Sequence, residues 1–452
     1  MAVDRAVCPL PILRTRFLLA TLMADLTTLF ANKICCPNPF WLASGPPANC
    51  GDQVMRAFDA GWGGAVWKTL GEPIVNVSSR YSSVDLNGQR MMGLNNIELI
   101  TDRPLETNLR EITAVKKRYP NNAVIASLMV ASTREAWQEI VKRSEGAGAD
   151  GLELNFGCPH GMSERGMGSA VGQVPQYCTM ITEWVKEVAQ TPVLVKLTPN
   201  VTDIRPVAQA AKDGGADGLS AINTINSITS IDLDTFVPRP NVDGKSAHGG
   251  YCGPAVKPIA LHMVQQLAEV GLPVSGIGGI STWRDAAEFL LLGAQSLQLC
   301  TAPMHHGFRI VEDLIDGLKN WMDEKGFRTI EDFRGRSLPN VTDWKNLNLN
   351  YKIVAKIHAE KCIGCDLCYI ACEDGAHQCI YIDARPATLT VTPIAKLDGP
   401  ISAPTVRVPR VDESECVGCN LCALVCPVEG CITMERVDRG VPAQSWEQRN
   451  AV

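Results

Sequence analysis

The stretches "GAGADGLEL" (residues 146–154) and "DGGADGLSA" (residues 213–221) carry one pattern twice: glycines, an aspartate and a short apolar run. Such a repeat predicts one joint used twice, in which a helix ends near glycine and a buried strand begins. Amphipathic stretches such as "REITAVKKRY" (residues 110–119) precede other apolar runs. The apolar runs lie at residues 40–45, 64–70, 123–130, 151–157, 192–198, 218–224, 273–279 and 296–302.

These eight runs predict the fold class. Strands that are almost wholly apolar and alternate with helices indicate a parallel sheet that is covered by helices. Eight such units within residues 40–302 favour a (β/α)8 TIM barrel over an open doubly wound sheet. We therefore expect an α/β barrel in the larger, N-terminal part of the chain.

Polar residues stand where the predicted strands end. They are Lys68, Asn155, Lys196, Asn223 and Thr224. Any one of them could simply bond the local backbone, but five on four strands of one barrel favour a functional site. Barrel enzymes place their chemistry at this C-terminal mouth. Two lysines at the same mouth suggest an anionic or electron-rich ligand.

The last two strands suggest which ligand this is. "SGIGGIST" (residues 275–282) and "CTAP" (residues 300–303) leave short backbone stretches, the first of them rich in glycine, beside predicted helix starts. Free N–H groups in such a corner bind phosphate in many barrels, although glycine can also serve only a tight turn. A phosphate together with the lysines fits FMN, and a phosphorylated sugar would fit these features as well.

The segment "GAGADG" (residues 146–151) also matches the dinucleotide pattern G-x-G-x-x-G. That fingerprint must follow a strand and open a helix, whereas here it precedes a strand. The match is therefore interpreted as a helix end. The sequence predicts no site for NAD or FAD of the Rossmann type in this chain.

The C-terminal region has the most specific motif. "CIGCDLCYIAC" (residues 362–372) and "CVGCNLCALVCP" (residues 416–427) repeat the spacing of bacterial two-cluster ferredoxins. Structural zinc is the alternative, but zinc sites rarely repeat this spacing twice. Glu373 stands where the motif has proline, and Cys379 and Cys431 lie outside the pattern and are expected to be buried thiols. In this motif the fourth cysteine serves the other cluster, so one [4Fe-4S] cluster is expected on Cys362, Cys365, Cys368 and Cys426 and the other on Cys416, Cys419, Cys422 and Cys372.

The composition of the chain indicates its cellular compartment and the partners that it is not expected to bind. Ten of the 18 cysteines lie between residues 362 and 431, which favours a reducing, cytoplasmic location over a disulfide-stapled secreted chain. The net charge of −6 argues against nucleic acid, and no run of 18 apolar residues predicts a membrane span. Translation is expected to begin at Met23, which would make residues 1–22 an extension.

We expect five segments along the chain. They are an N-terminal extension (1–24), an FMN-binding barrel (25–335), a linker (336–352), a small α+β two-cluster ferredoxin domain (353–440) and a tail (441–452). Iron–sulfur clusters pass single electrons, and a flavin can collect two of them to reduce an organic substrate. A flavin in the predicted barrel would therefore collect the electrons that the predicted clusters carry.

Four stretches carry a resemblance to a known family. "LELNFGCPHGMSERGMGSAVGQ" (152–173), "KLTPNVTDI" (196–204), "GGADG" with "INT" (214–224) and "NNIELI" (95–100) resemble the pyrimidine-reducing half of dihydropyrimidine dehydrogenase. The likeness runs from about residue 25 to 435, includes the cluster tail, and is similar to the bacterial form with a separate catalytic subunit. It implies reversible reduction of uracil and thymine to their 5,6-dihydro forms. It also implies electrons from NAD(P)H through an FAD and iron–sulfur partner subunit, in a heterotetramer with two copies of each.

The resemblance also implies roles for single residues. Cys158 matches the acid that protonates C5 of the pyrimidine while FMN delivers hydride to C6. The family often has serine where Gly157 stands, so one substrate contact is in doubt. The matching substrate residues are Asn96, Asn155, Phe156, Gly157, Asn223 and Thr224. The matching FMN contacts are Ser44, Lys68, Thr69, Lys196, Gly253, Gly278, Gly279, Ile280, Thr301 and Ala302.

The chemistry of Cys158 leaves alternatives open. A free thiol is mostly protonated near neutrality and can act as a general acid. His160 lies two residues on and could deprotonate the thiol, which would make Cys158 a nucleophile. Cys158 could also be a small core residue. Glycines at positions 161, 166, 168 and 172 would let this loop close over a substrate.

Three other functions remain as alternatives. A dihydroorotate-type dehydrogenase with a fused ferredoxin would share the barrel. An electron-transfer subunit would bind flavin without turning over a substrate, although the strand-end asparagines count against it. A transfer-RNA dihydrouridine synthase uses similar flavin chemistry, but the acidic net charge disfavours it.

Overall fold

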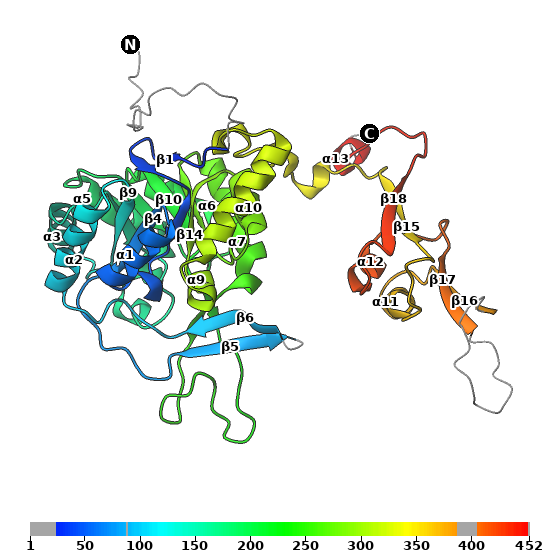
Figure 1. The fold of residues 1–452 in the computed structure, drawn as a ribbon, viewed down its shortest axis with the longest axis horizontal. Helices are drawn as coiled ribbons and strands as arrows, with labels where there is room; N and C mark the ends of the chain where they lie inside the picture. The colour runs from blue at the N-terminus through cyan, green and yellow to red at the C-terminus, as the bar shows by residue number, and fades with distance from the viewer. Residues whose placement is uncertain (1–23, 87–88, 387–404, 451–452) are drawn as a thin grey trace, which may run out of the picture. The chain divides into compact units, whose positions relative to one another are not determined.

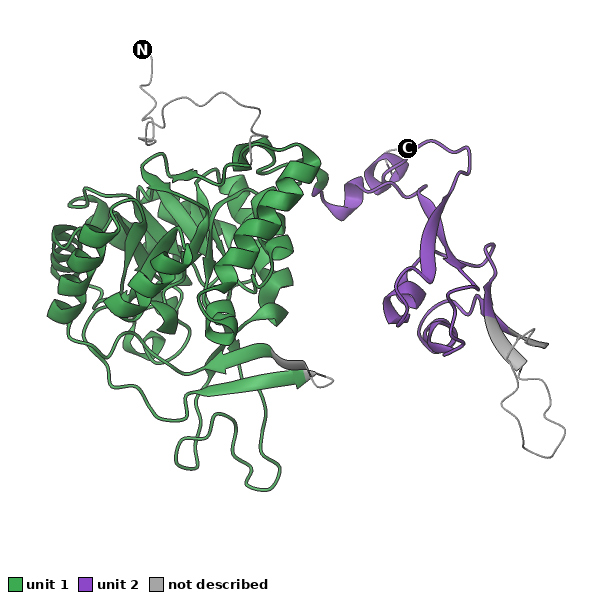
Figure 2. Cartoon of the chain, in the orientation of Figure 1, with its two compact units in different colours: residues 1–340 green, residues 341–452 purple. Residues whose placement is uncertain are grey.

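The computed structural model describes residues 24–86, 89–386 and 405–450. The chain forms two compact units, residues 1–340 and residues 341–452 (Figure 2). The predicted extension at residues 1–22 and the proposed start at Met23 lie outside the described residues. Within the described ranges, no helix is long and apolar enough to cross a membrane.

The first unit is a closed barrel of eight parallel strands, and each of the eight predicted apolar runs supplies one strand. The barrel closes because β14 pairs with β3, with Leu297 opposite Phe40. Most of these strands are buried on both faces, which explains their apolar sequences. The strands are β3 (Phe40–Leu42), β4 (Gly64–Leu70), β7 (Ala123–Leu128), β8 (Gly151–Asn155), β9 (Val193–Lys196), β10 (Gly218–Ala221), β13 (Val274–Ile277) and β14 (Ala294–Leu299).

Helices surround the strands, as Figure 1 shows. Each has one apolar face toward the barrel; in α2, for example, Leu109, Ile112 and Val115 are buried at helical spacing. The main helices are α1 (Gly51–Ala60), α2 (Leu105–Arg118), α3 (Arg134–Gly146), α5 (Pro175–Lys186), α6 (Arg205–Asp213), α7 (Lys257–Val270), α8 (Trp283–Leu291) and α10 (Ile310–Lys325). Shorter helices are α4 (Ser169–Gly172), α9 (Thr301–His306) and the 3₁₀ turns η1 (Pro46–Ala48), η2 (Ser163–Arg165), η3 (Pro254–Val256), η4 (Ile330–Asp332) and η5 (Leu338–Asn340).

The two glycine-rich joints make the same set of contacts. They connect α3 to β8 and α6 to β10. Asp150 accepts a hydrogen bond from the Val124 amide at 2.8 Å, and Asp217 accepts one from the Val193 amide at 2.9 Å. Each carboxylate also pairs at 2.7 Å with a lysine from α2 or α5. The aspartate of each joint therefore fastens the start of one strand to its neighbour.

Two β-structures of the first unit were not predicted from the sequence. The hairpin of β1 (Thr28–Phe30) and β2 (Ile34–Cys36) places Phe30 and Ile34 in a buried cluster with Trp41 and Val66. A second, antiparallel sheet has the order β11-β12-β6-β5. Its strands are β5 (Tyr81–Leu86), β6 (Gln89–Asn96), β11 (Ile225–Ser227) and β12 (Gly249–Cys252).

The second unit is a small α+β domain, as predicted. Strand β15 (Lys352–Ile357) pairs antiparallel with β18 (Ile432–Val437), and β16 (Ile380–Pro386) pairs antiparallel with β17 (Thr405–Val411). Each cysteine motif leads into a helix, which is α11 (Leu367–Gly375) in the first and α12 (Leu421–Val425) in the second. The remaining elements are η6 (Trp344–Asn346) and α13 (Trp446–Asn450).

Replacing Asp217 by alanine should lower the free energy of unfolding of the barrel by about 1–3 kcal/mol, because Lys186 and the Val193 amide lose a partly buried acceptor. Burial raises the pKa of Asp217, but these two hydrogen bonds and the charges of Lys186 and Lys33 together outweigh it and hold the pKa below its usual range. The difference from the parent should therefore shrink as the pH falls through that lowered value.

Urea unfolding followed by tryptophan fluorescence measures this effect. Asp213→Ala is the matched control, because Asp213 is exposed and its carboxylate accepts a hydrogen bond from Gln209 in the same helix. The control should change stability by less than about 0.5 kcal/mol. Equal losses in the two variants would show that the joint is not fastened by Asp217.

Candidate active site

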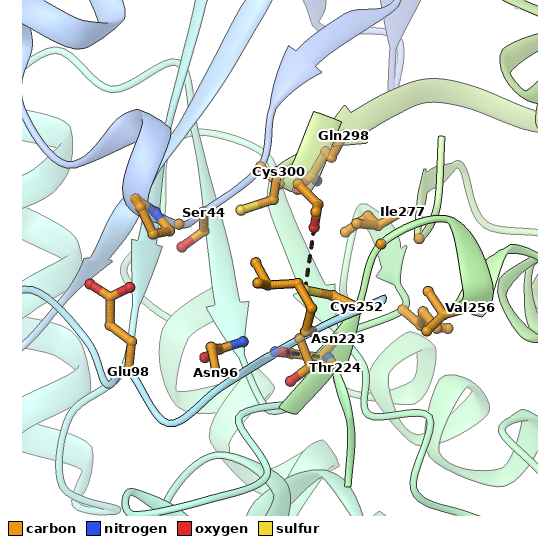
Figure 3. Close-up of a pocket in the computed structure, with 18 of the residues that line it drawn as sticks. Ser44, Asn96, Glu98, Asn223, Thr224, Cys252, Val256, Ile277, Gln298 and Cys300 are labelled. Atoms are coloured by element: carbon orange, nitrogen blue, oxygen red, sulfur yellow. Dashed lines mark hydrogen bonds between the residues drawn. The ribbon is translucent and has the colours of Figure 1, made fainter. Parts of the chain in front are cut away.

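A cavity lies where the barrel strands end, and it holds about 1150 Å³ of space including its open mouth. Residues at the ends of β3, β4, β8, β9, β10, β13 and β14 line it, together with β6 and β12 of the antiparallel sheet. Figure 3 shows Ser44, Asn96, Asn223 and Cys300 around this space.

Most of the predicted site residues meet in this cavity. The two exceptions are Phe156 and Gly157, which do not line it. Those that do are Ser44, Lys68, Thr69, Asn96, Asn155, Cys158, Lys196, Asn223, Thr224, Gly253, Gly278, Gly279, Ile280, Thr301 and Ala302.

Phe156 faces away from the predicted ligand. Its side chain is fully buried, and its ring packs edge-to-face on Trp137 of α3 with 5.9 Å between ring centroids. Gly157 has a steric reason to lack a side chain, because a Cβ there would come within 2.5 Å of the Asn223 Cβ. The glycine therefore lets Asn223 occupy the place that a serine side chain would need.

Side-chain amides and hydroxyls form one connected network in the cavity. Asn223 donates to Asn155 Oδ1 at 3.0 Å, and Asn155 donates to Thr69 Oγ1 at 3.0 Å. Thr69 in turn lies 3.0 Å from Ser44 Oγ. This network fixes the orientation of both asparagines, and each amide has a second N–H that can donate to a ligand.

Both lysines of the cavity face carboxylates that the sequence reasoning missed. Lys68 pairs with Glu98 at 2.5 Å, and Lys196 lies 3.5 Å from Glu153, which is fully buried. Each lysine therefore already has an anionic partner within the chain. A charged residue within the apolar run "GLELN" was the signal that could have revealed Glu153.

Tyr81 extends the pair around Glu98. Its hydroxyl donates to the Glu98 carboxylate, and Arg80 lies 3.3 Å from the same carboxylate. Burial and this hydrogen bond raise the pKa of Tyr81 well above its usual value. The phenol therefore stays neutral beside the cavity.

The predicted phosphate corner is present in part. Gly278 and Gly279 have φ of +127° and +79°, and a Cβ on Gly279 would come within 2.8 Å of the Lys257 amide nitrogen. Only glycine fits this close approach of backbone to backbone. The Asp285 carboxylate already accepts the N–H groups of Ser281 and Thr282 at the start of α8. A phosphate here would therefore have to use the glycines and the Thr301–Ala302 backbone.

Cys158 is a buried, protonated thiol on the wall of the cavity. It is 8% exposed, and burial raises its pKa to about 11. Its Sγ donates to the carbonyl oxygen of His160 at 3.5 Å rather than to the imidazole ring. Burial also lowers the pKa of His160, whose Nε2 lies 3.1 Å from the Glu98 carbonyl oxygen. This geometry favours a proton donor over a nucleophile activated by histidine.

The loop after Cys158 packs its methionine side chains against the thiol. Met162 and Met167 are buried in a cluster with Cys158 and Ile100. Gly168 adopts φ of +57°, and a Cβ there would come within 2.7 Å of the Cys158 carbonyl oxygen. The loop thus contributes apolar side chains that shield the thiol.

The second unit gathers the motif cysteines around two small cavities. Each set contains three cysteines of one motif and the fourth of the other, as the ferredoxin spacing requires. Within the described ranges no group of three or more His, Cys, Asp or Glu side chains is placed to hold a single metal ion. One cavity is lined by Cys362, Cys365, Cys368 and Cys426, and the other by Cys372, Cys416, Cys419 and Cys422.

Comparison with known proteins agrees with this arrangement. The dihydroorotate dehydrogenase family matches residues 26–322, and the 4Fe-4S dicluster domain matches residues 355–434. The chain is 42% identical over 421 residues to the NAD-dependent dihydropyrimidine dehydrogenase subunit PreA of Escherichia coli K12, covering 92% of this chain and 97% of that one.

The chain is also similar to two other dehydrogenases. The chloroplastic dihydropyrimidine dehydrogenase (NADP(+)) of Arabidopsis thaliana is 44% identical over 331 residues, covering 70% of this chain and 78% of its own. The catalytic subunit of dihydroorotate dehydrogenase B (NAD(+)) from Pyrococcus horikoshii is 39% identical over 302 residues, covering 67% of this chain and 94% of its own.

Two kinds of cofactor follow from these matches. The dihydroorotate dehydrogenase family binds FMN, and the dicluster domain carries two [4Fe-4S] clusters. The glycine corner, the polar network and the two sets of thiols fit these groups. The chain belongs to the dihydropyrimidine dehydrogenase family and joins an FMN barrel to a two-cluster iron–sulfur domain.

Proposed function

We propose that this chain is the catalytic subunit of a dihydropyrimidine dehydrogenase that reversibly reduces the 5,6 double bond of uracil and thymine. The observation that carries the proposal is the buried Cys158 thiol, which shares a cavity with the amides of Asn96, Asn155 and Asn223. Uracil and thymine present alternating carbonyl and N–H groups. Side-chain amides, which both donate and accept, are suited to bind that edge.

A residue of this chain supplies the proton for the reaction. FMN, when bound, supplies a hydride to C6 of the pyrimidine. Cys158 holds the proton for C5, and its raised pKa keeps that proton in place at neutral pH. Burial dominates the raised pKa of Cys158 and the charge of Lys196 opposes it, so Lys196 stabilises the thiolate that is left after transfer. In the reverse direction the same sulfur accepts the proton.

The charge of the cavity supports a neutral substrate over a carboxylate such as orotate. Among the described residues that line it, the cationic side chains are Lys68 and Lys196, and each is paired with a glutamate. A substrate carboxylate would need an unpaired cation to offset its desolvation. Uracil carries no such charge, and the amide network offers it uncharged hydrogen-bonding groups.

The proposed FMN contacts come from three parts of the barrel mouth. The segment after β3 supplies Ser44, and strands β4 and β9 supply Lys68, Thr69 and Lys196. The loop before η3 supplies Gly253. Gly278, Gly279, Ile280, Thr301 and Ala302 form the corner for the phosphate, and flavin absorbance of the purified protein would exclude a phosphorylated sugar as the ligand.

Electrons would reach this chain through a partner. The relative in Escherichia coli is named a subunit and NAD-dependent, which supports a partner that oxidises NAD(P)H. We propose an FAD and iron–sulfur partner subunit in a heterotetramer with two copies of each chain. The many free thiols among the described cysteines support a reducing compartment, and the cytoplasm is the proposed one.

Replacing Cys158 by alanine tests the proton donor. Uracil reduction should fall by about 10²–10⁴-fold while flavin content is kept, because the variant loses its general acid but keeps the cavity. Cys178→Ala is the control, since Cys178 is fully buried in α5 and does not line the cavity. Turnover of Cys158→Ala equal to that of the control would refute the assignment.

The pH dependence of flavin reoxidation by uracil tests the state of the thiol. In a single turnover of reduced enzyme, the rate should stay flat between about pH 7 and pH 10, because burial raises the pKa of Cys158 to about 11. A thiol with its ordinary pKa of about 8.5 would lose rate roughly tenfold per pH unit above that value. Reoxidation by ferricyanide, which needs no proton on carbon, is the control for other pH effects.

A further inference from the structure

Two cysteines outside the ferredoxin motifs lie against the cluster ligands. Cys379 is 4% exposed, and its Sγ is 3.6 Å from the Sγ of Cys372. Cys431 is 2% exposed and lines the same cavity as Cys426. Both line the same cavities as the motif cysteines, so each cavity has five sulfurs where a [4Fe-4S] cluster binds four.

The two extra cysteines have equivalent positions. Cys379 immediately precedes β16, and Cys431 immediately precedes β18. Each lines a cavity together with the fourth cysteine of one motif and the first cysteine of the other. Cys379 shares its cavity with Cys372 and Cys416, and Cys431 shares its cavity with Cys426 and Cys362. An arrangement present in both halves of the domain argues against chance burial of two thiols.

We propose that Cys379 and Cys431 are reserve ligands that bind the cluster in place of Cys372 and Cys426 when those sulfurs are lost. The required movement is small. Rotating a cysteine about χ1 from one staggered well to another moves its sulfur by about 3 Å. That displacement is comparable with the 3.6 Å that separates the sulfurs of Cys372 and Cys379.

The exchange is a substitution of one thiolate for another. The reserve thiol releases its proton to solvent, and its sulfur forms the bond to the iron that has lost the sulfur of Cys372 or Cys426. Any water that had taken the vacant position leaves. No electron moves, so the charge and the oxidation state of the cluster are those that it had with the original ligand.

Alanine variants of the full chain, purified anaerobically, test the proposal by iron and acid-labile sulfide content. Alanine is preferred to serine because a serine oxygen can itself bind iron. The parent should hold about eight iron atoms per chain, as two four-iron clusters require. Cys372→Ala and Cys379→Ala should each keep about eight iron atoms, and the double variant should keep about four. The pair Cys426 and Cys431 should repeat this pattern.

Cys419→Ala is the matched control, because Cys419 is an exposed ligand of the same cavity as Cys379. This variant should lose its cluster or retain three irons, which an EPR signal of the oxidised protein would reveal. Iron loss in Cys372→Ala equal to that in Cys419→Ala would overturn the proposal. So would failure of Cys372→Ala to fold, or iron loss in Cys379→Ala alone, since that result would make Cys379 a resident ligand.

Discussion

The carboxylate of Glu153 is the buried charge on which the barrel mouth depends. It lies in β8, and its Oε2 accepts hydrogen bonds from Ser220 of β10 and Gln298 of β14, both at 2.8 Å. Lys196 of β9 lies 3.5 Å from its other oxygen. An ionised carboxylate is stable in a protein interior only when such partners surround it. The floor of the cavity therefore forms only when strands β8, β9, β10 and β14 are in the correct register.

This pairing sets the character of the site above it. Because Glu153 balances Lys196 and Glu98 balances Lys68, the cavity has little unpaired charge among its described residues. Uncharged amides and hydroxyls then provide the recognition. The same desolvated environment keeps Cys158 protonated, so burial has both a structural and a chemical consequence. Substrate binding and proton supply thus follow from one electrostatic condition.

The sequence predicted the barrel because its strands are buried on both faces and therefore stand out as apolar runs. The sheet of β5, β6, β11 and β12 was missed because these strands are short or partly exposed and have no such run. Phe156 was assigned to the site because it matches a substrate residue of the family that the sequence resembles. Successive side chains of an extended chain point to opposite faces, so Asn155 faces the cavity and Phe156 faces α3.

The charge partner of Lys68 and the surroundings of Cys379 and Cys431 also could not be predicted from the sequence. Glu98 and Lys68 are 30 residues apart and meet only because the antiparallel sheet brings the chain over the barrel mouth. Cys379 and Cys431 were expected to be buried thiols, and they are buried, but the cavities that they share with motif cysteines depend on how the two halves of the domain fold together. Spacing along the chain predicts ligands, whereas proximity in space needs the fold.

The most direct test of the central claim compares uracil with orotate as oxidants of the anaerobically reduced protein. Flavin absorbance in a stopped-flow single turnover reports the reaction without the partner subunit. Our account predicts that uracil reoxidises the flavin at least about 100-fold faster than orotate, because both lysines among the described residues that line the cavity are paired with glutamates. Equal rates, or faster reoxidation by orotate, would contradict it.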